Sequence, residues 1–220
     1  MNKTLYILII IIIIILIRLY YEKTHIIYFI NSFINNNNIV GVSVPKNILD
    51  NIIIYIVSLK LIDQVPTELS HNYTFIDFGC GLGNVIKGVY NIVDKVEGIE
   101  LDDNLATIAK NKFSMYKNVK IYNMNMIDYK FNDVNTILYL YEPLWLMKDK
   151  TQVRNIYTTV FNNLISQVKN SKIIIIYCDS VFNKLLDINF FKQYNLTLIN
   201  KIKYPRFIPF SYNNLYIITK

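Results

Sequence analysis

The sequence predicts an α/β fold, with helices on both faces of a doubly wound and mostly parallel sheet. From Val44 onward, short β-rich runs alternate with helical stretches, which is typical of parallel strands joined through helices. The run 172–177 has only isoleucine at its centre, and such a run suits a strand that is buried on both faces. With 53% hydrophobic and 18% charged residues among 220, the composition excludes a disordered chain, a collagen-like repeat and a charged coiled coil.

The elements of this fold can be placed in order along the chain. Pro45 suits the first turn of a helix, which we expect to end near Ile62. We then expect strand 74–78, helix 84–92, strand 95–99, helix 103–116, strand 119–123, strand 136–141, helix 150–168, strand 172–177, helix 180–191, and strands 195–203 and 214–219. A short connection that contains Pro205 and Pro209 joins the last two strands, so we expect an antiparallel hairpin.

An apolar segment precedes this domain. Residues 4–17 carry no charge and are nearly all Ile and Leu. A bilayer core needs about 20 apolar residues, but Arg18 can extend its charge to the interface, and the tyrosines that follow it suit that interface. A cleaved signal peptide is the alternative, although no small-x-small cleavage site follows. We expect a single-pass anchor in contact with membrane lipid at 1–21, a linker at 22–43, and a domain on the cytosolic side at 44–220.

The net charge and the cysteine spacing indicate whether the protein binds nucleic acid, an anionic membrane or a metal ion. A net charge of +7 and a pI near 9.2 are typical of proteins that bind nucleic acid or anionic membranes. However, the chain has 40 Ile and 28 Asn but two Ala and three Arg, so its lysine excess follows the codon bias of an AT-rich genome. A nucleic-acid partner therefore stays open but is not favoured. Cys80 and Cys178 show no C-x-x-C spacing, and we expect no metal site.

A glycine loop follows the first strand of the domain. Gly79, Gly81 and Gly83 alternate directly after the strand and before a helix, where an open α/β sheet binds a nucleoside-like cofactor. The dinucleotide fingerprint requires a glycine at 84, where Asn84 stands. A purely structural turn is the alternative. Glu100 ends the next strand about 20 residues further on, where a carboxylate can accept hydrogen bonds from both ribose hydroxyls of a dinucleotide or an adenosyl group.

These residues resemble the cofactor motifs of the class I S-adenosylmethionine-dependent methyltransferases. The order D-x-G-x-G-x-G from Asp77 resembles motif I, and Gly98-Ile99-Glu100 is similar to the second motif. The resemblance covers about 44–220 and implies a Rossmann-like, seven-stranded sheet with an antiparallel last strand. It implies that S-adenosylmethionine is the cofactor and that Asp128 meets the adenine amino group, with Met126 and Ile127 beside the ring. The implied cofactor-binding residues are Asp77, Gly79, Cys80, Gly81, Gly83, Glu100 and Asp128.

The acceptor motif of amino-group methyltransferases has a partial match after the fourth strand. Where that family carries Asn or Asp, Pro, Pro and an aromatic residue, this chain has Glu142, Pro143, Leu144 and Trp145. The resemblance implies that Glu142 accepts the amine hydrogens and that Trp145 encloses the acceptor. The candidate catalytic residues are therefore Tyr141, Glu142 and Trp145. The alternative is that Glu142 caps a helix or forms a salt bridge while Trp145 packs.

Together these features predict a membrane-anchored enzyme that transfers a methyl group to an amine. An apolar N-terminal segment and Val44-Pro45 at the start of the domain look like the FAM173-type protein-lysine methyltransferases, so we expect a protein lysine, or else a small amine, as the acceptor. A nucleic-acid or small-molecule methyltransferase is the near alternative. A catalytically inactive, cofactor-binding interaction module is the alternative from another class.

Overall fold

The computed structural model describes residues 73–141, 143–144, 147–179, 186–205 and 212–220. The chain divides into two compact units, Met1–Val42 with Pro205–Ser211, and Ser43–Tyr204 with Tyr212–Lys220. All the elements described below belong to the second unit, except the last residue of one strand. The expected anchor, linker and first helix lie outside the described residues. Within the described ranges, no helix is both long enough and apolar enough to cross a bilayer.

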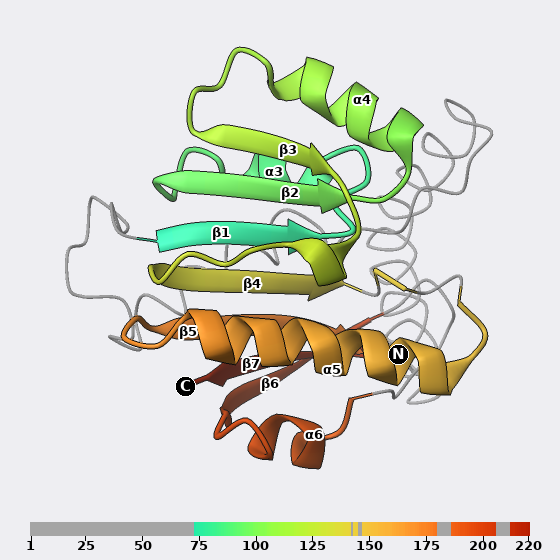
Figure 1. The fold of residues 1–220 in the computed structure, drawn as a ribbon, viewed down its shortest axis with the longest axis vertical. Helices are drawn as coiled ribbons and strands as arrows, with labels where there is room; N and C mark the ends of the chain where they lie inside the picture. Colours follow the sequence, from blue (N-terminus) through green and yellow to red (C-terminus); the bar gives the residue numbers. More distant parts are fainter. Residues whose placement is uncertain (1–72, 142, 145–146, 180–185, 206–211) are drawn as a thin grey trace, which may run out of the picture. The chain divides into compact units, whose positions relative to one another are not determined.

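The described part is an α/β domain built on one seven-stranded sheet (Figure 1). The strand order is β3-β2-β1-β4-β5-β7-β6; β1 to β5 pair in parallel, and β7 is antiparallel to β5. This confirms the predicted doubly wound sheet with an antiparallel last strand. In chain order the elements are β1 (Tyr73–Phe78), α3 (Asn84–Val89), β2 (Lys95–Glu100), α4 (Asp103–Phe113), β3 (Val119–Asn123), the 3-10 turn η1 (Met126–Asp128), β4 (Asn135–Tyr141), α5 (Lys150–Gln167), β5 (Ile173–Asp179), α6 (Ile188–Lys192), β6 (Thr197–Pro205) and β7 (Tyr212–Thr219).

Side-chain caps explain where two of the helices begin. The Asp102 carboxylate accepts a hydrogen bond from the Leu105 backbone N–H at the start of α4. The Asp149 carboxylate accepts from the amides of Thr151 and Gln152 at the start of α5. Each cap satisfies amides that have no partner within the helix, so both helices begin where the sequence predicts.

Helix α3 ends three residues earlier than expected, at Val89 rather than at Ile92. The Asn118 side-chain amide donates to the carbonyls of Tyr90 and Val93, at 2.6 and 3.4 Å. These carbonyls follow the helix end, and the bonds satisfy them without a further helical turn. Because Asn118 is distant in sequence, local periodicity did not indicate this end.

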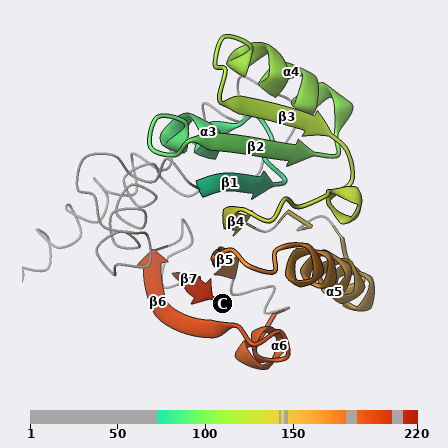
Figure 2. The same ribbon diagram turned by 60° about the vertical axis from the view of Figure 1, so that its left-hand side comes forward.

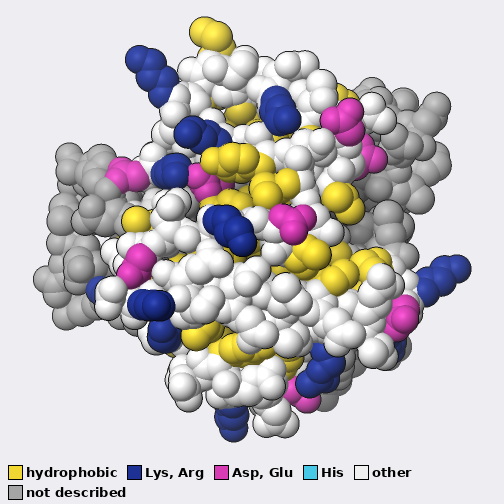
Figure 3. All heavy atoms as spheres, in the orientation of Figure 1, with side chains coloured by type: hydrophobic (Ala, Val, Ile, Leu, Met, Phe, Trp, Pro, Cys, Tyr) yellow, Lys and Arg dark blue, Asp and Glu magenta, His cyan; other side chains and the backbone are white. Residues whose placement is uncertain are grey.

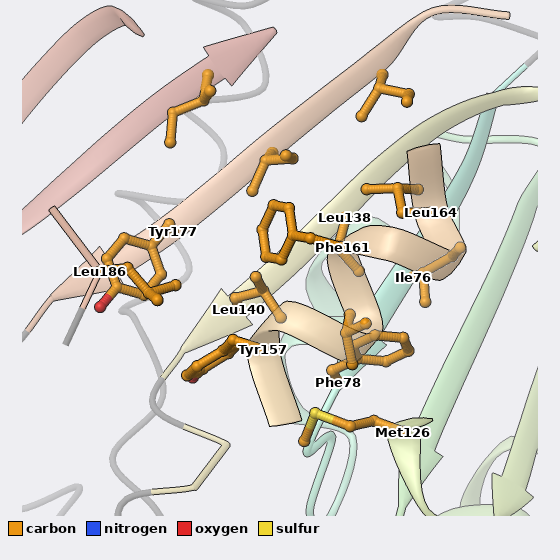
Figure 4. Close-up of a cluster of buried hydrophobic side chains, with 14 of the residues drawn as sticks. Ile76, Phe78, Met126, Leu138, Leu140, Tyr157, Phe161, Leu164, Tyr177 and Leu186 are labelled. Carbon is orange, nitrogen blue, oxygen red and sulfur yellow. The ribbon is translucent and has the colours of Figure 1, made fainter. Parts of the chain in front are cut away.

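The sheet carries a separate hydrophobic cluster on each face. One cluster packs α3 and the end of α4 on the sheet, with Phe75, Ile86 and Phe113 among its members. The other packs α5 and α6 on the opposite face, which Figure 2 shows. In Figure 4, Phe161 and Leu164 of α5 point toward side chains of β1 and β4. Because β1 pairs in parallel with both β2 and β4, the carboxyl ends of these three strands meet at one edge of the sheet (Figure 1).

Candidate functional site

The glycine loop lies at this edge, between β1 and α3. Gly79, Gly81 and Gly83 have φ angles of 76°, 52° and 70°, in the left-handed region that favours glycine. The amides of Gly79 and Cys80 both donate to the Ile99 carbonyl, at 2.8 and 3.1 Å. These bonds fasten the loop to the end of β2. The alternation of glycines seen in the sequence is therefore a requirement of the backbone path.

Two of these glycines also allow close contacts. A Cβ atom on Gly79 would lie 2.7 Å from the Pro143 Cβ atom, and one on Gly83 would lie 2.3 Å from the Phe113 ring. Phe113 therefore packs the end of α4 against the loop. Pro143 belongs to the acceptor motif, so the structure brings the segment after β4 directly against the loop.

Asp77 lies beneath the loop and is 3% exposed. Among the described residues, its Oδ2 atom has no hydrogen-bond partner. Burial, together with the nearby Glu100 carboxylate, raises the pKa of Asp77 from 3.8 to about 8. The carboxyl group is therefore protonated at neutral pH and can donate a hydrogen bond. A buried polar atom without a partner at a ligand edge fits a site that is completed by a bound molecule.

Glu100 joins the loop to the end of β2. Its Oε2 atom accepts a hydrogen bond from the Gly81 amide at 2.8 Å, and its Oε1 atom accepts from the Asp102 amide at 2.9 Å. Each carboxylate oxygen has a further lone pair, so Glu100 can still accept hydrogen bonds from two ribose hydroxyls. Together, Asp77 and Glu100 fit the polar groups of an adenosyl cofactor.

Cys80 is buried inside the loop, and burial raises the pKa of its thiol well above the usual range. The thiol is therefore protonated and is not a nucleophile. Gly98 of β2 makes room for it, since a Cβ atom there would lie 2.8 Å from the Cys80 sulfur and 2.6 Å from Ile86 Cδ1.

The η1 turn carries Asp128 and follows β3, whose last residue, Asn123, pairs with Glu100. The Asp128 side chain is exposed and Ile127 is half-buried. Met126 is only 8% exposed and packs in the second core cluster, where Figure 4 shows it near Phe78. Met126 therefore supports the turn from the core side, and Ile127 is the apolar side chain left beside Asp128.

The three candidate catalytic residues are described only in part. Tyr141 is half-buried at the end of β4, and its ring stacks on Tyr139 with centroids 6.4 Å apart and planes 5° apart. It packs against the first core cluster. Glu142 and Trp145 lie outside the described residues, so their roles stay predictions.

Two further residues support the site and were missed in the sequence. The Lys112 ammonium of α4 donates to the Leu82 carbonyl at 2.9 Å and to the Asn84 side chain at 3.3 Å. The Asn123 side-chain amide donates to the backbone carbonyls of Glu100 and Leu101, at 3.2 and 3.1 Å. Asn123 ends a strand at the cofactor edge, and that position is a signal that could have identified it. For Lys112 the sequence offers no such signal.

The comparisons with known proteins decide the family. The sequence model described as ribosomal RNA adenine dimethylase matches residues 47–203 of the chain. The chain belongs to this family. The ribosomal RNA adenine dimethylase family consists of S-adenosylmethionine-dependent methyltransferases, so S-adenosylmethionine is the cofactor, in agreement with the resemblance seen in the sequence. A search of curated protein sequences found no significant match.

Solved structures share the fold of this member of the ribosomal RNA adenine dimethylase family. Magnesium protoporphyrin IX methyltransferase (ChlM) from Synechocystis, solved with bound S-adenosylmethionine, is 12% identical at a TM-score of 0.56, over 90% of this chain and 97% of that one. The yhhF protein of Escherichia coli is 13% identical at 0.55, over 82% and 89%. The N-methyltransferase NodS of Bradyrhizobium japonicum is 10% identical at 0.54, over 78% and 98%. At these identities the likeness concerns the fold alone.

Proposed function

We propose that the protein transfers a methyl group from S-adenosylmethionine to an amino nitrogen, with an adenine in RNA as the first acceptor class. Contact between Pro143 and the glycine loop carries the proposal. A Cβ atom on Gly79 would lie 2.7 Å from Pro143, so the segment with the acceptor motif begins against the cofactor loop. Family membership favours adenine, because the matching family is described by adenine dimethylation in ribosomal RNA.

The cofactor supplies an activated methyl group on a sulfonium ion, so the protein needs only to bind, orient and exclude water. Asp77 can donate a hydrogen bond into the site, and Glu100 can accept from hydroxyl groups, as their environments indicate. On the acceptor side, Glu142 would hold the amino hydrogens while the nitrogen lone pair stays free for in-line attack. Trp145 would cover the acceptor from water.

Protein lysine is the second candidate, and the residue at 142 favours it. The motif of amino-group methyltransferases has Asn or Asp here, whereas this chain has the longer acid Glu142. A carboxylate complements the positive charge of a lysine ammonium, while the adenine amino group is neutral. Leu144 in place of the second proline is a further departure from the motif.

The charge distribution bears on the choice between RNA and protein. The chain has a net charge of +7, which attracts polyanions. On the face shown in Figure 3, however, Lys and Arg side chains are spread out, with acidic side chains between them. The proposal for RNA therefore rests on the family, and not on an extended basic surface on this face.

Membrane attachment through residues 1–21 is also part of the proposal, with the domain on the cytosolic side. The uncharged run at 4–17 supports it. Deletion of 1–21 should move the protein from the membrane pellet to the soluble fraction. Retention of the shortened chain in the pellet would show that attachment lies elsewhere.

The acceptor is tested by letting the full chain choose between two substrates. The protein is incubated with methyl-labelled S-adenosylmethionine, ribosomal RNA and total cell protein, and each fraction is hydrolysed and analysed by mass spectrometry. Label in N6-methylated adenosine supports the first candidate, and label in methyl-lysine supports the second. Glu142→Gln separates them further. A lysine side chain arrives as an ammonium ion and must lose a proton before its lone pair can attack the methyl group, so loss of the carboxylate should slow transfer to lysine more than transfer to the neutral adenine amino group. Label in neither residue would refute both.

A further inference from the structure

The turn that follows β3 is held by side chains from distant elements. We call residues 125–129 the η1 loop; it contains Asp128, the residue expected at the adenine amino group. The Asn125 side chain accepts a hydrogen bond from the Ile127 amide at 3.2 Å. The Asp128 amide donates to the Asn125 carbonyl at 3.0 Å. These local bonds shape the loop but do not fix its place on the sheet.

One distant anchor comes from β2. Glu97 lies in the middle of this strand and is only 2% exposed. The Tyr129 hydroxyl, at the end of the η1 loop, donates a hydrogen bond to Glu97 Oε2. Burial and this hydrogen bond raise the pKa of Tyr129 far above its usual range, so the hydroxyl keeps its proton and stays a donor.

The Glu97 carboxylate has two further partners. Lys95 forms an ion pair with its Oε1 atom at 2.7 Å, and the Tyr122 hydroxyl donates to the same atom at 3.3 Å. A buried carboxylate is costly unless it is paired and hydrogen-bonded, and these contacts meet that requirement. Glu97 is thus a fixed acceptor, and the bond from Tyr129 ties the η1 loop to the middle of strand β2.

A second distant anchor comes from α5. The Asn163 side-chain amide donates to the Ile127 carbonyl at 3.0 Å. Ile127 and Tyr129, the neighbours of Asp128 on either side, are therefore both held by residues more than 30 positions away, at separations of 36 and 32. The Asp128 side chain between them is exposed. The backbone is fixed on both sides of a carboxylate that is itself free to meet a ligand.

We propose that Glu97, Tyr129 and Asn163 are positioning residues that set the Asp128 carboxylate at the adenine amino group of the cofactor. The inference rests on the proposed function, since it takes S-adenosylmethionine as the cofactor and Asp128 as the residue that binds the amino group of its adenine. A hydrogen bond between the Asp128 carboxylate and the amino group depends steeply on distance and angle, so the anchors determine how well adenine is distinguished from other bases. A merely structural role would affect stability and would leave base discrimination unchanged.

The experiment measures base discrimination with two cofactor products. Isothermal titration of the full chain gives Kd for S-adenosylhomocysteine and for its hypoxanthine analogue, which has a carbonyl in place of the amino group. We expect wild type to prefer the adenine compound by about tenfold or more, because a carbonyl facing a carboxylate leaves both acceptors unpaired. Tyr129→Phe removes only the hydroxyl and should reduce this preference about fivefold. Asn163→Asp replaces the donor without a change in shape and should act in the same direction.

Matched controls remove the same groups elsewhere. Tyr194→Phe deletes a hydroxyl that donates to the Thr158 carbonyl of α5 and has no part in the contacts of Glu97 or the η1 loop described above. Asn162→Asp introduces the same charge as Asn163→Asp at the preceding residue of α5, which is exposed. Both controls should keep the wild-type preference. Thermal melts of each variant identify any loss of folding.

The outcomes separate the inference from the function on which it rests. If Tyr129→Phe and Asn163→Asp weaken both compounds equally, the anchors are structural and the inference is overturned. If wild type shows no preference between the compounds, Asp128 does not recognise the adenine of the cofactor, and the inference is again overturned. Methyl transfer by the same protein would then still support the proposed function. If wild type binds neither compound, the cofactor site itself is refuted.

Discussion

Replacement of Asp77 by asparagine should change how the stability of the protein depends on pH. Asp77 is buried beneath the glycine loop, and within the described structure its Oδ2 atom has no hydrogen-bond partner. Burial and the Glu100 carboxylate raise its pKa from 3.8 to about 8. In the folded chain the carboxyl group thus keeps its proton at pH values where the unfolded chain has lost it. Asparagine has nearly the same shape but does not titrate.

The sign and size follow from proton linkage. Between about pH 4 and pH 8 the folded state binds one more proton at Asp77 than the unfolded state, so the free energy of unfolding falls as pH rises. Each pH unit in this interval lowers it by about 1.4 kcal/mol, and the whole interval amounts to on the order of 5 kcal/mol. The effect is complete above the folded-state pKa. Relative to wild type, Asp77→Asn should therefore become more stable as pH rises.

The assay is urea unfolding of wild type and Asp77→Asn at pH 5, 6, 7 and 8, without cofactor. We expect the difference in free energy of unfolding to grow by about 1.4 kcal/mol per pH unit between pH 5 and pH 7, to grow more slowly as pH nears 8, and to level off only in a further measurement at pH 9. Asp103→Asn is the control, because it makes the same replacement at an exposed site on the first turn of α4. If Asp77→Asn and wild type keep a constant difference across this range, Asp77 does not titrate as described, and its role as a proton donor in the site is refuted.

Three other substitutions test the packing and the support of the site. Gly98→Ala should lower the free energy of unfolding by about 1–3 kcal/mol, because its Cβ atom would meet three side-chain atoms within 2.8 Å; an unchanged urea midpoint would contradict this packing. Glu100→Ala should raise the Kd for S-adenosylmethionine at least about tenfold, since it loses the expected acceptor for the ribose hydroxyls and the hydrogen bond to the Gly81 amide. An unchanged Kd in isothermal titration would exclude a role of Glu100 in cofactor binding. Lys112→Met should raise KM for the cofactor about threefold to tenfold while kcat stays near wild type, with partial rescue by Lys112→Arg. A fall in kcat alone would argue against support of the loop by Lys112.

The fold was predictable because its signals are local. Alternation of β-rich and helical runs predicted the strands, and strand β3, at Val119–Asn123, has the bounds expected from the sequence. The family resemblance implied an antiparallel last strand, and β7 is antiparallel to β5. Helix ends were less predictable, since the end of α3 depends on Asn118. A bond across 28 residues leaves no trace in local periodicity.

The candidate cofactor site divides in the same way. The glycine loop could be identified because it directly follows a strand and its left-handed backbone requires glycine. Glu100 could be identified because it is a carboxylate at the end of the next strand. The supports contributed by Lys112, Glu97 and Asn163 could not, since each acts across 30 or more residues. A buried Glu in mid-strand is unusual and could have marked Glu97, but its partner Tyr129 only becomes visible in the fold.

The most direct test of the central claim is a methyl-transfer assay with the purified full chain. Methyl-labelled S-adenosylmethionine is incubated with ribosomal RNA and cell protein, with wild type and Glu100→Ala side by side, and label is measured in a purified macromolecule after removal of the free cofactor. We expect wild type to place label on amino nitrogen and Glu100→Ala to place far less at a limiting cofactor concentration. Cofactor binding by wild type without label in RNA or protein would contradict the proposed transfer and leave a small-molecule acceptor or a cofactor-binding interaction module.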